Sequence, residues 1–178
     1  IRLSLVGSEM CIRDRFYIGQ DKPLDHPDVL NGKFNQGPNL WPEALPEFRA
    51  TMEQYQRELE GVAQLLMQGV ALSLGLPEQH FASFCHDAMT TLRLLHYPPQ
   101  SPSAAPGEKG CGAHTDWGGL TLLLQDDNSG LQVWDQESND WIWAMPVPGS
   151  YVVNIGDLIS RWTNDLYRST LHLSLIHI

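Results

Sequence analysis

The second half of the sequence is a series of short apolar segments separated by turn-forming residues, and this pattern most restricts the possible fold. The segments are of strand length, and clusters of Asp, Asn, Ser, Gly or Pro lie between them; they cover 90–97, 120–125, 131–134, 141–144, 151–155 and 166–172. Closely spaced short strands are typical of an antiparallel sandwich or barrel. The sequence shows no alternation of strands with helices, which argues against Rossmann and TIM-barrel layouts. We therefore predict a mainly β domain.

Helical sequence precedes these strands. Apolar residues recur at steps of three and four between Phe48 and Leu74, and Gly75 ends the pattern. A shorter helix is predicted from Glu78 to His86. We accordingly expect flanking helices, with a helical part over residues 43–87 and a β part over residues 89–172.

The two ends of the chain differ in character from the sequence between them. Residues 4–15 resemble translated sequencing-adaptor read-through, and the closing residues resemble the same kind of sequence. We therefore expect non-native tails at 1–15 and 173–178, and an incomplete domain over 16–172. The alternative, that both ends are native segments, stays open. On the first expectation, His177 is discounted as a metal ligand.

Charge and cysteine content narrow the classes of partner and location. The formal net charge of −10 disfavours nucleic acid and anionic membrane surfaces, because both attract basic patches. The three cysteines form neither a CxxC pair nor a disulfide framework, so we expect a reduced, cytoplasmic setting. The longest apolar run is too short to span a bilayer. We expect a monomer that acts on a small-molecule substrate, with neither nucleic acid nor membrane as partner.

A histidine and a carboxylate stand two residues apart where one of the predicted strands begins. In an extended chain residues i and i+2 face the same side, so His114 and Asp116 can point to one place. His172 follows 56 positions later (172 − 116), and a jelly roll can bring such distant strands together. Two histidines and one carboxylate form the facial triad of non-haem Fe(II) oxygenases. We predict these three residues as metal ligands; the alternative is a polar turn capped by Asp116 and a core histidine at position 172.

The metal-ligand candidates belong to a set of motifs that occur in a fixed order along the chain. These motifs are His114–Leu123, Gly130–Val133, Val152–Asp157, Trp162–Asn164 and Arg168–His172, and further likeness extends upstream through Leu92–Pro99 to about Phe16. Together they closely resemble the isopenicillin-N-synthase-like family of 2-oxoglutarate- and Fe(II)-dependent dioxygenases. Several ordered motifs at compatible spacings make a chance match improbable.

The resemblance has implications for the fold, the cofactors and the site. It implies a double-stranded β-helix (jelly roll) whose C-terminal strands are missing from this chain. It implies an oxidoreductase that uses Fe(II), 2-oxoglutarate and O2, and that couples decarboxylation of 2-oxoglutarate to oxidation of a small organic substrate. The iron ligands map onto His114, Asp116 and His172, and Tyr97 matches the tyrosine that binds the cosubstrate carboxylate. No catalytic residue is implied beyond the metal ligands.

Two departures from the family pattern bear on 2-oxoglutarate binding. Leu95 stands where the family usually has an asparagine, two residues before the tyrosine. The Arg-x-Ser pair expected soon after the distal histidine is absent from the six residues that follow His172. The alternative that this protein is a family member that uses no 2-oxoglutarate therefore stays open. The rival from another class is a non-catalytic jelly-roll binding module with a structural or vestigial metal site, in which Cys111 could take part in binding zinc.

Overall fold

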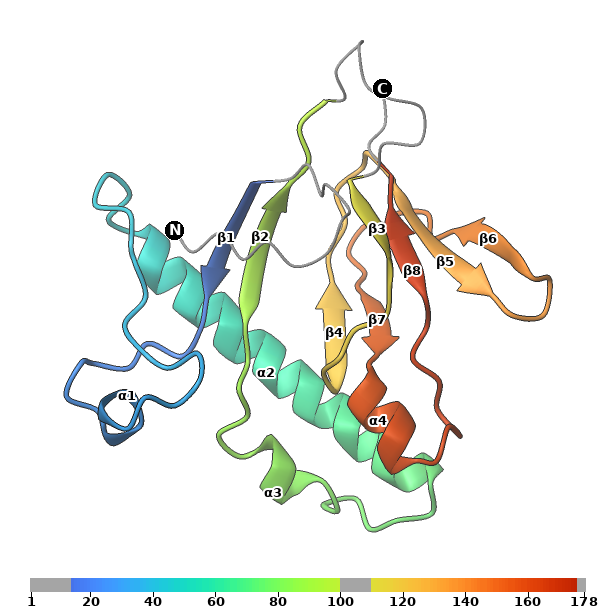
Figure 1. The fold of residues 1–178 in the computed structure, drawn as a ribbon, viewed down its shortest axis with the longest axis horizontal. Coiled ribbons are helices and arrows are strands. Elements are labelled where there is room, and N and C mark those ends of the chain that lie inside the picture. The colour runs from blue at the N-terminus through green and yellow to red at the C-terminus, as the bar shows by residue number, and fades with distance from the viewer. Residues whose placement is uncertain (1–13, 100–109, 176–178) are drawn as a thin grey trace. The chain divides into compact units, whose positions relative to one another are not determined.

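A computed structural model describes residues 14–99 and 110–175 (Figure 1). The chain forms two compact units: one comprises Arg15–Leu94, and the other contains Asp14 and the described residues from Leu95 onward. None of the described helices is long and apolar enough to cross a membrane.

The predicted tails are only partly covered by the structure. Cys11, His177 and most other residues of both tails lie outside the described residues. All the described ones except Leu175 take part in strands: β1 begins at Asp14, and β8 ends at Ser174. The non-native origin of these ends stays a prediction.

The first unit contains the long predicted helix and a pair of strands. Its elements are α1 (Pro27–Leu30), α2 (Phe48–Ser73), α3 (Ala82–Cys85) and most of β1 (Asp14–Ile18) and β2 (Leu92–His96), whose outer residues 14 and 95–96 are counted with the other unit. Strands β1 and β2 pair in a two-stranded sheet. The rings of Phe16 on β1 and Phe48 on α2 meet edge to face, 5.7 Å apart between centroids. The prediction of a long helix is confirmed, and it packs against a strand.

The end of α2 follows from one glycine. Gly75 adopts a left-handed conformation, with φ 71°, which glycine tolerates because it has no Cβ. The turn lets the Leu76 N–H donate to the Ala71 carbonyl at 2.9 Å and the Gly75 N–H donate to the Leu72 carbonyl at 3.0 Å. These two bonds form a Schellman motif, which satisfies carbonyls at the helix end.

The short helix is smaller than predicted. Only Ala82–Cys85 is α-helical, whereas the prediction covered Glu78–His86. Ahead of it the chain makes tight turns, in which the His80 N–H donates to the Pro77 carbonyl at 2.9 Å. A bond over three residues closes a tighter turn than an α-helix, so the apolar spacing marks a compact segment here and not a full helix.

The second unit is the predicted β domain. Its elements are β3 (Cys111–His114), β4 (Leu120–Leu123), β5 (Leu131–Asp135), β6 (Asp140–Trp143), β7 (Val152–Ile155), α4 (Asp157–Trp162) and β8 (His172–Ser174). Four strands form one sheet in the order β3-β8-β5-β6, and β4 pairs with β7 in a second sheet (Figure 1). The pairings β3–β8, β5–β8, β5–β6 and β4–β7 are all antiparallel. The prediction of antiparallel strands in a mainly β domain is confirmed.

The last strand lies between two earlier strands. Strand β8 pairs on one side with β3 and on the other with β5, so the end of the described chain occupies the interior of the sheet. Leu131 of β5 and Leu173 of β8 are both buried, with 8% and 2% of their surface exposed. Burial of Leu173 inside the sheet therefore helps to fix the position of its neighbour His172.

Two predictions for the segment before β8 are wrong. Residues 157–162 form the helix α4, although only turn-forming residues are predicted between the strands at 151–155 and 166–172. The strand predicted over 166–172 begins only at His172. Between them, Asn164 and Asp165 have positive φ, and the Thr163 hydroxyl accepts a hydrogen bond from the Tyr167 N–H at 3.1 Å. These local side-chain bonds and turn conformations hold the segment out of a strand.

Candidate metal centre

Strand pairing brings the two predicted histidine ligands together. His114 ends β3 and His172 begins β8, and the two residues are direct partners in the antiparallel register. Their imidazole rings lie 4.3 Å apart between centroids and are tilted by 52°. Cross-strand partners of this kind have neighbouring side chains. A separation of 58 residues (172 − 114) is thus closed by a single strand pair.

Asp116 completes the group from the loop after β3. Its Oδ1 lies 3.9 Å from His114 Nε2 and 3.8 Å from His172 Nε2. One ligand atom of each of the three residues lies within 4.8 Å of the others. The structure therefore brings together all three residues that the sequence predicts as a metal site.

Each histidine ring is oriented by the backbone carbonyl two residues earlier in the chain. His114 Nδ1 lies 2.8 Å from the Gly112 carbonyl oxygen, and His172 Nδ1 lies 3.0 Å from the Thr170 carbonyl oxygen. A carbonyl oxygen only accepts, so the proton is assigned to Nδ1 in both rings and the lone pair to Nε2. Both lone pairs then belong to the nitrogen nearer Asp116, as metal-binding histidines require.

The carboxylate of Asp116 is held in its charged form. Burial raises its pKa, but hydrogen bonds from the Thr121 hydroxyl and the Asn154 amide, with the nearby His172 and His114, outweigh burial and lower the pKa below its usual value. The Asn154 bond is short, at 2.7 Å from Nδ2 to Asp116 Oδ2. A charged carboxylate beside two imidazole rings gives a nitrogen and oxygen donor set that suits Fe(II).

The backbone of the Asp116 loop is anchored on the start of α4. The Asp157 N–H donates to the Asp116 carbonyl at 2.7 Å, the Gly156 N–H to the Gly119 carbonyl at 2.8 Å, and the Leu158 N–H to the Gly118 carbonyl at 3.1 Å. A Cβ on Gly156 would lie 2.2 Å from the Gly118 oxygen. Glycine is therefore needed here for the close approach of two backbones.

Three of these supporting residues have no role that the sequence alone predicts. Thr121, Asn154 and Gly156 all lie within motifs that carry the family resemblance, yet spacing alone gives no reason to place them beside Asp116. The pairing of β4 with β7 identifies two of them, because it makes Thr121 and Asn154 direct partners, and the close contact with Gly118 identifies Gly156.

The other histidines have different surroundings. His26 caps α1, with Nδ1 accepting from the Asp28 N–H at 3.1 Å. His96, which has no carboxylate beside it in the sequence, lies 3.2 Å from Asp14, and both side chains are largely exposed. Within the described residues, the group around Asp116 is the one set of three that could hold a metal ion.

Cys111 stands on the wrong side of His114 to complete a zinc site. Its Sγ lies 3.8 Å from His114 Nδ1, the nitrogen that faces away from the metal side of the ring. Cys111 is also buried, with 6% of its surface exposed. The geometry therefore disfavours a closed site with a thiolate as fourth ligand.

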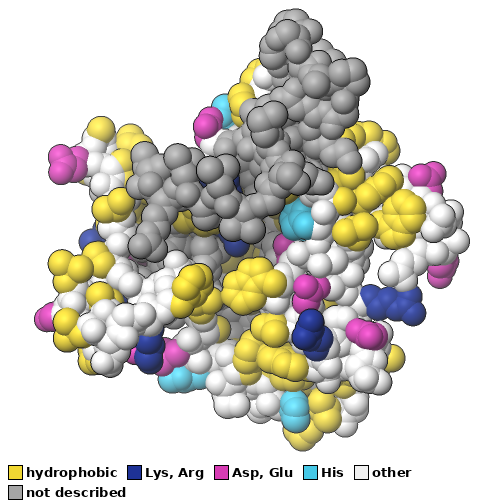
Figure 2. All heavy atoms as spheres, in the orientation of Figure 1, with side chains coloured by type: hydrophobic (Ala, Val, Ile, Leu, Met, Phe, Trp, Pro, Cys, Tyr) yellow, Lys and Arg dark blue, Asp and Glu magenta, His cyan; other side chains and the backbone are white. Residues whose placement is uncertain are grey.

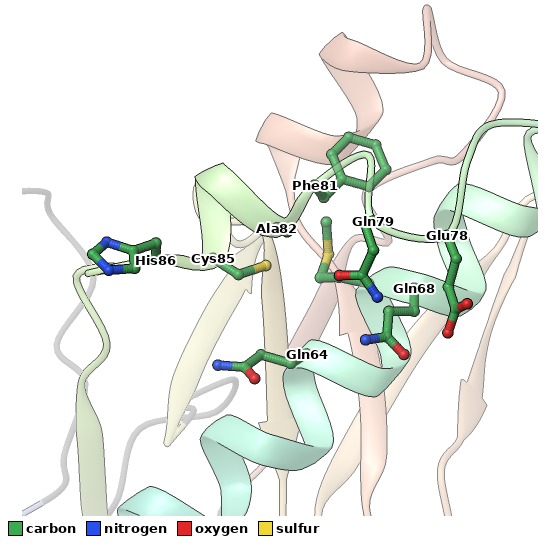
Figure 3. A pocket seen from close by; sticks show the side chains of 9 residues that line it. Gln64, Gln68, Glu78, Gln79, Phe81, Ala82, Cys85 and His86 are labelled. Atoms are coloured by element: carbon green, nitrogen blue, oxygen red, sulfur yellow. The ribbon is translucent and has the colours of Figure 1, made fainter.

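A separate pocket lies in the first unit and contains none of the three metal-ligand candidates (Figure 3). It has a volume of about 170 Å³, and glutamine amides supply much of its polar lining; its residues are Gln64, Met67, Gln68, Glu78, Gln79, Phe81, Ala82, Cys85 and His86. The Cys85 thiol has its pKa raised by burial, which disfavours the reactive thiolate. Nothing in this pocket forms a catalytic set.

Basic side chains form no broad patch on the face shown in Figure 2. There the described Lys and Arg side chains lie singly among acidic, apolar and neutral ones. Recognition of a nucleic-acid backbone usually needs such residues to cluster, so this face gives no support for that class of partner.

Comparison with known proteins is consistent with the fold and the site. Residues 87–175 match the model of the 2OG-Fe(II) oxygenase superfamily. The 2-oxoglutarate-Fe(II) type oxidoreductase hxnY of Emericella nidulans is 42% identical over 171 residues, which cover 94% of this chain and 49% of that protein. The 2-oxoglutarate-dependent dioxygenase citB of Monascus ruber is 43% identical over 168 residues, covering 90% of this chain and 51% of that one.

Solved structures share the fold. A full-length Neurospora crassa protein, crystallised with alpha-KG and thymine, has a TM-score of 0.82 and 33% identity; the match covers 94% of this chain and 49% of that one. A 2OG-Fe(II) oxygenase family protein from Caulobacter crescentus gives a TM-score of 0.79 at 30% identity, over 98% of this chain and 54% of the other.

The chain belongs to the 2OG-Fe(II) oxygenase superfamily, whose members use Fe(II), 2-oxoglutarate and O2. The family resemblance and the jelly-roll fold predicted from the sequence are confirmed. The chain spans about half the length of the curated relatives it matches.

Proposed function

We propose that the protein from which this chain comes is a non-haem Fe(II) dioxygenase that couples decarboxylation of 2-oxoglutarate to oxidation of a small organic substrate. The observation that supports this most directly is the convergence of His114, Asp116 and His172, with both histidine Nε2 atoms within 4 Å of one carboxylate oxygen. Three protein donors would fill three of the six coordination positions of an octahedral metal ion and leave three open. Fe(II), when bound, would supply the redox chemistry of the reaction.

The chain's own residues hold and expose the metal site. The Nδ1–H bonds to Gly112 and Thr170 fix the two rings, and Asn154 holds the carboxylate. The side chain of His114 is 42% exposed, whereas those of Asp116 and His172 are 19% and 16% exposed. The site is thus more open on the His114 side, and we expect cosubstrate and substrate to approach from there.

We further propose that Tyr97 binds the cosubstrate carboxylate, on the strength of the family resemblance. Tyr97 follows β2 and is half-buried. None of the described arginines is assigned to the distal carboxylate: Arg93 stacks on Tyr17 at 5.3 Å, and Arg168 donates to Gln136.

The remaining features of the proposal concern organisation and setting. We propose an incomplete dioxygenase domain over 16–172, with a helical part over 43–87 and a jelly-roll part over 89–172, and non-native tails at 1–15 and 173–178. We propose a cytoplasmic monomer whose substrate is a small molecule. The Neurospora crassa structure with thymine supports the substrate class.

Anaerobic titration with Fe(II), followed by calorimetry, tests the metal site in the 178-residue chain. We expect one equivalent to bind and His114→Ala to weaken binding by more than about 100-fold, because loss of a supporting residue alone already weakens metal binding 10–100-fold. His86→Ala is the matched control, since His86 is 81% exposed and lies in the other unit.

A second measurement tests the cosubstrate. In a chain restored to the length of its relatives, addition of 2-oxoglutarate to the Fe(II) form should produce a visible charge-transfer band, and turnover should release succinate. Equal iron binding by wild type and His114→Ala, with no band, would contradict the proposal and favour a non-catalytic binding module.

A further inference from the structure

The two oxygens of Asp116 have different surroundings. Oδ1 is the atom that lies 3.9 and 3.8 Å from the two histidine Nε2 atoms. Oδ2 accepts a hydrogen bond from the Asn154 amide at 2.7 Å. The carboxylate is therefore fixed in rotation about its last bond, with one oxygen toward the histidines and the other toward Asn154.

The support comes from a registered strand pair and not from the Asp116 loop itself. Asn154 on β7 and Thr121 on β4 are direct partners; the Asn154 amide donates to Asp116 Oδ2 at 2.7 Å, and the Thr121 hydroxyl contributes to the lowered pKa of Asp116. Partners in an antiparallel pair project to the same face of the sheet, so one ladder position brings both polar side chains to one carboxylate. We call Thr121 and Asn154 the carboxylate clamp.

The orientation of the carboxylate determines how many metal positions remain open. With one oxygen bound, Asp116 and the two histidines fill three of six octahedral positions, and three stay open. With both oxygens bound, four positions are filled and two stay open. A cosubstrate that chelates through two atoms, together with O2, needs three.

We propose that Asn154, assisted by Thr121, is a positioning residue that makes Asp116 a one-oxygen metal ligand and so keeps three coordination positions free. This inference rests on the proposed function, because it assumes that the triad binds a metal. The amide is suited to the role: it carries two N–H donors and no charge, so it occupies Oδ2 without competing for the cation.

Removal of the Asn154 donor should leave the fold intact. The pairing of β7 with β4 runs through backbone groups, which substitution of the side chain does not remove. In Asn154→Leu, of similar size, we expect Oδ2 to become free to turn toward the metal. Asn154→Gln keeps the amide and should restore part of the wild-type behaviour.

Titration with Co(II) as the probe metal tests the inference without turnover. For Asn154→Leu we expect a 10–100-fold loss of affinity, the range typical when a residue that supports a metal ligand is lost. We also expect a change in the Co(II) visible spectrum, because the number of bound oxygens changes. Thr121→Val should shift both quantities in the same direction by less, and Thr121→Ser, which keeps the hydroxyl, should remain near wild type.

Val153→Ala is the matched control on the same strand, since the Val153 side chain is 44% exposed and belongs to no part of the site. Far-ultraviolet circular dichroism shows whether each variant is folded. If Asn154→Leu is unfolded, comparison of Thr121→Val with Thr121→Ser provides the test. If wild type binds Co(II) and both Asn154→Leu and Thr121→Val keep the wild-type affinity and spectrum, the positioning role of the clamp is refuted and the proposed function is not. Failure of wild type to bind metal would overturn the clamp and the proposed function together.

Discussion

Substitution of Gly156 by alanine tests how the metal-binding loop is held. The alanine Cβ would lie 2.2 Å from the Gly118 oxygen, whereas real Cβ contacts essentially never fall below 3.0 Å. The two backbones must therefore separate by about 0.8 Å (3.0 − 2.2). The backbone φ of Gly156 is −92°, which alanine adopts easily, so the close contact and not the conformation opposes the substitution.

The expected destabilisation follows from the bonds beside that contact. Three N–H groups at the start of α4 donate to the loop at 2.7, 2.8 and 3.1 Å. A separation of 0.8 Å along these bonds would stretch all three to 3.5 Å or beyond. Each such bond contributes about 1 kcal/mol. Alanine also restricts the unfolded chain, which stabilises by about 0.4–1 kcal/mol. We expect a net loss of about 2 kcal/mol in the free energy of unfolding.

Urea denaturation and anaerobic Fe(II) titration measure the two consequences. Gly156→Ala should lower the free energy of unfolding and also weaken Fe(II) binding, because the loop that moves carries Asp116. Gly118→Ala is the matched control in the same contact, since a Cβ at Gly118 would meet nothing within 4 Å. If Gly156→Ala were as stable as Gly118→Ala and bound Fe(II) like wild type, anchoring of the loop on α4 would be refuted.

Two further predictions concern the helical unit and the cosubstrate. Gly75→Ala places a side chain at φ 71° and should lower the free energy of unfolding by about 1–2 kcal/mol, measured by thermal or urea unfolding. Gly61→Ala, inside α2 with open space around its Cβ, is the control and should raise the free energy of unfolding by up to about 1 kcal/mol. Equal changes in the two variants would contradict the Schellman motif at Gly75. In the length-restored protein, Tyr97→Phe should raise the KM for 2-oxoglutarate about tenfold or more with kcat little changed, since a hydrogen bond to a charged group contributes about 1.5–3 kcal/mol; an unchanged KM would exclude Tyr97 from cosubstrate binding.

Much of the architecture was predictable because periodicity reports which face of an element is buried. The long helix α2 was predicted from its apolar spacing, and its end from Gly75. The turn between β5 and β6 was predicted from its polar residues, and the structure explains them: the Asp135 carboxylate accepts from the backbone N–H groups of Glu137 and Ser138. Both are local relations, which a short window of sequence contains.

The missed elements depend on contacts between distant segments. Helix α4 has six residues, too few for a periodic pattern, and its first N–H groups bond the loop that follows β3, about 40 residues earlier (157 − 116 = 41). Strand β8 begins at His172 because its partners there are β3 and β5, and neither relation is visible in the residues before it. The two histidines and the aspartate could be predicted as candidate ligands from residue type and family motifs. The clamp could be identified only from the register of β4 with β7, which the sequence does not show.

The three candidate ligands depend on three different kinds of support. The strand pair β3–β8 sets the separation of the two histidines, and the carbonyl two residues before each histidine sets the orientation of its ring. Asp116 lies outside any strand, so its backbone depends on α4 and its side chain on the clamp. Loss of a ring-orienting bond would turn one donor, whereas movement of α4 would shift the carboxylate relative to both histidines at once. Substitution of Gly156, which contacts no metal-binding atom, should therefore still weaken Fe(II) binding, because it moves the loop that carries Asp116.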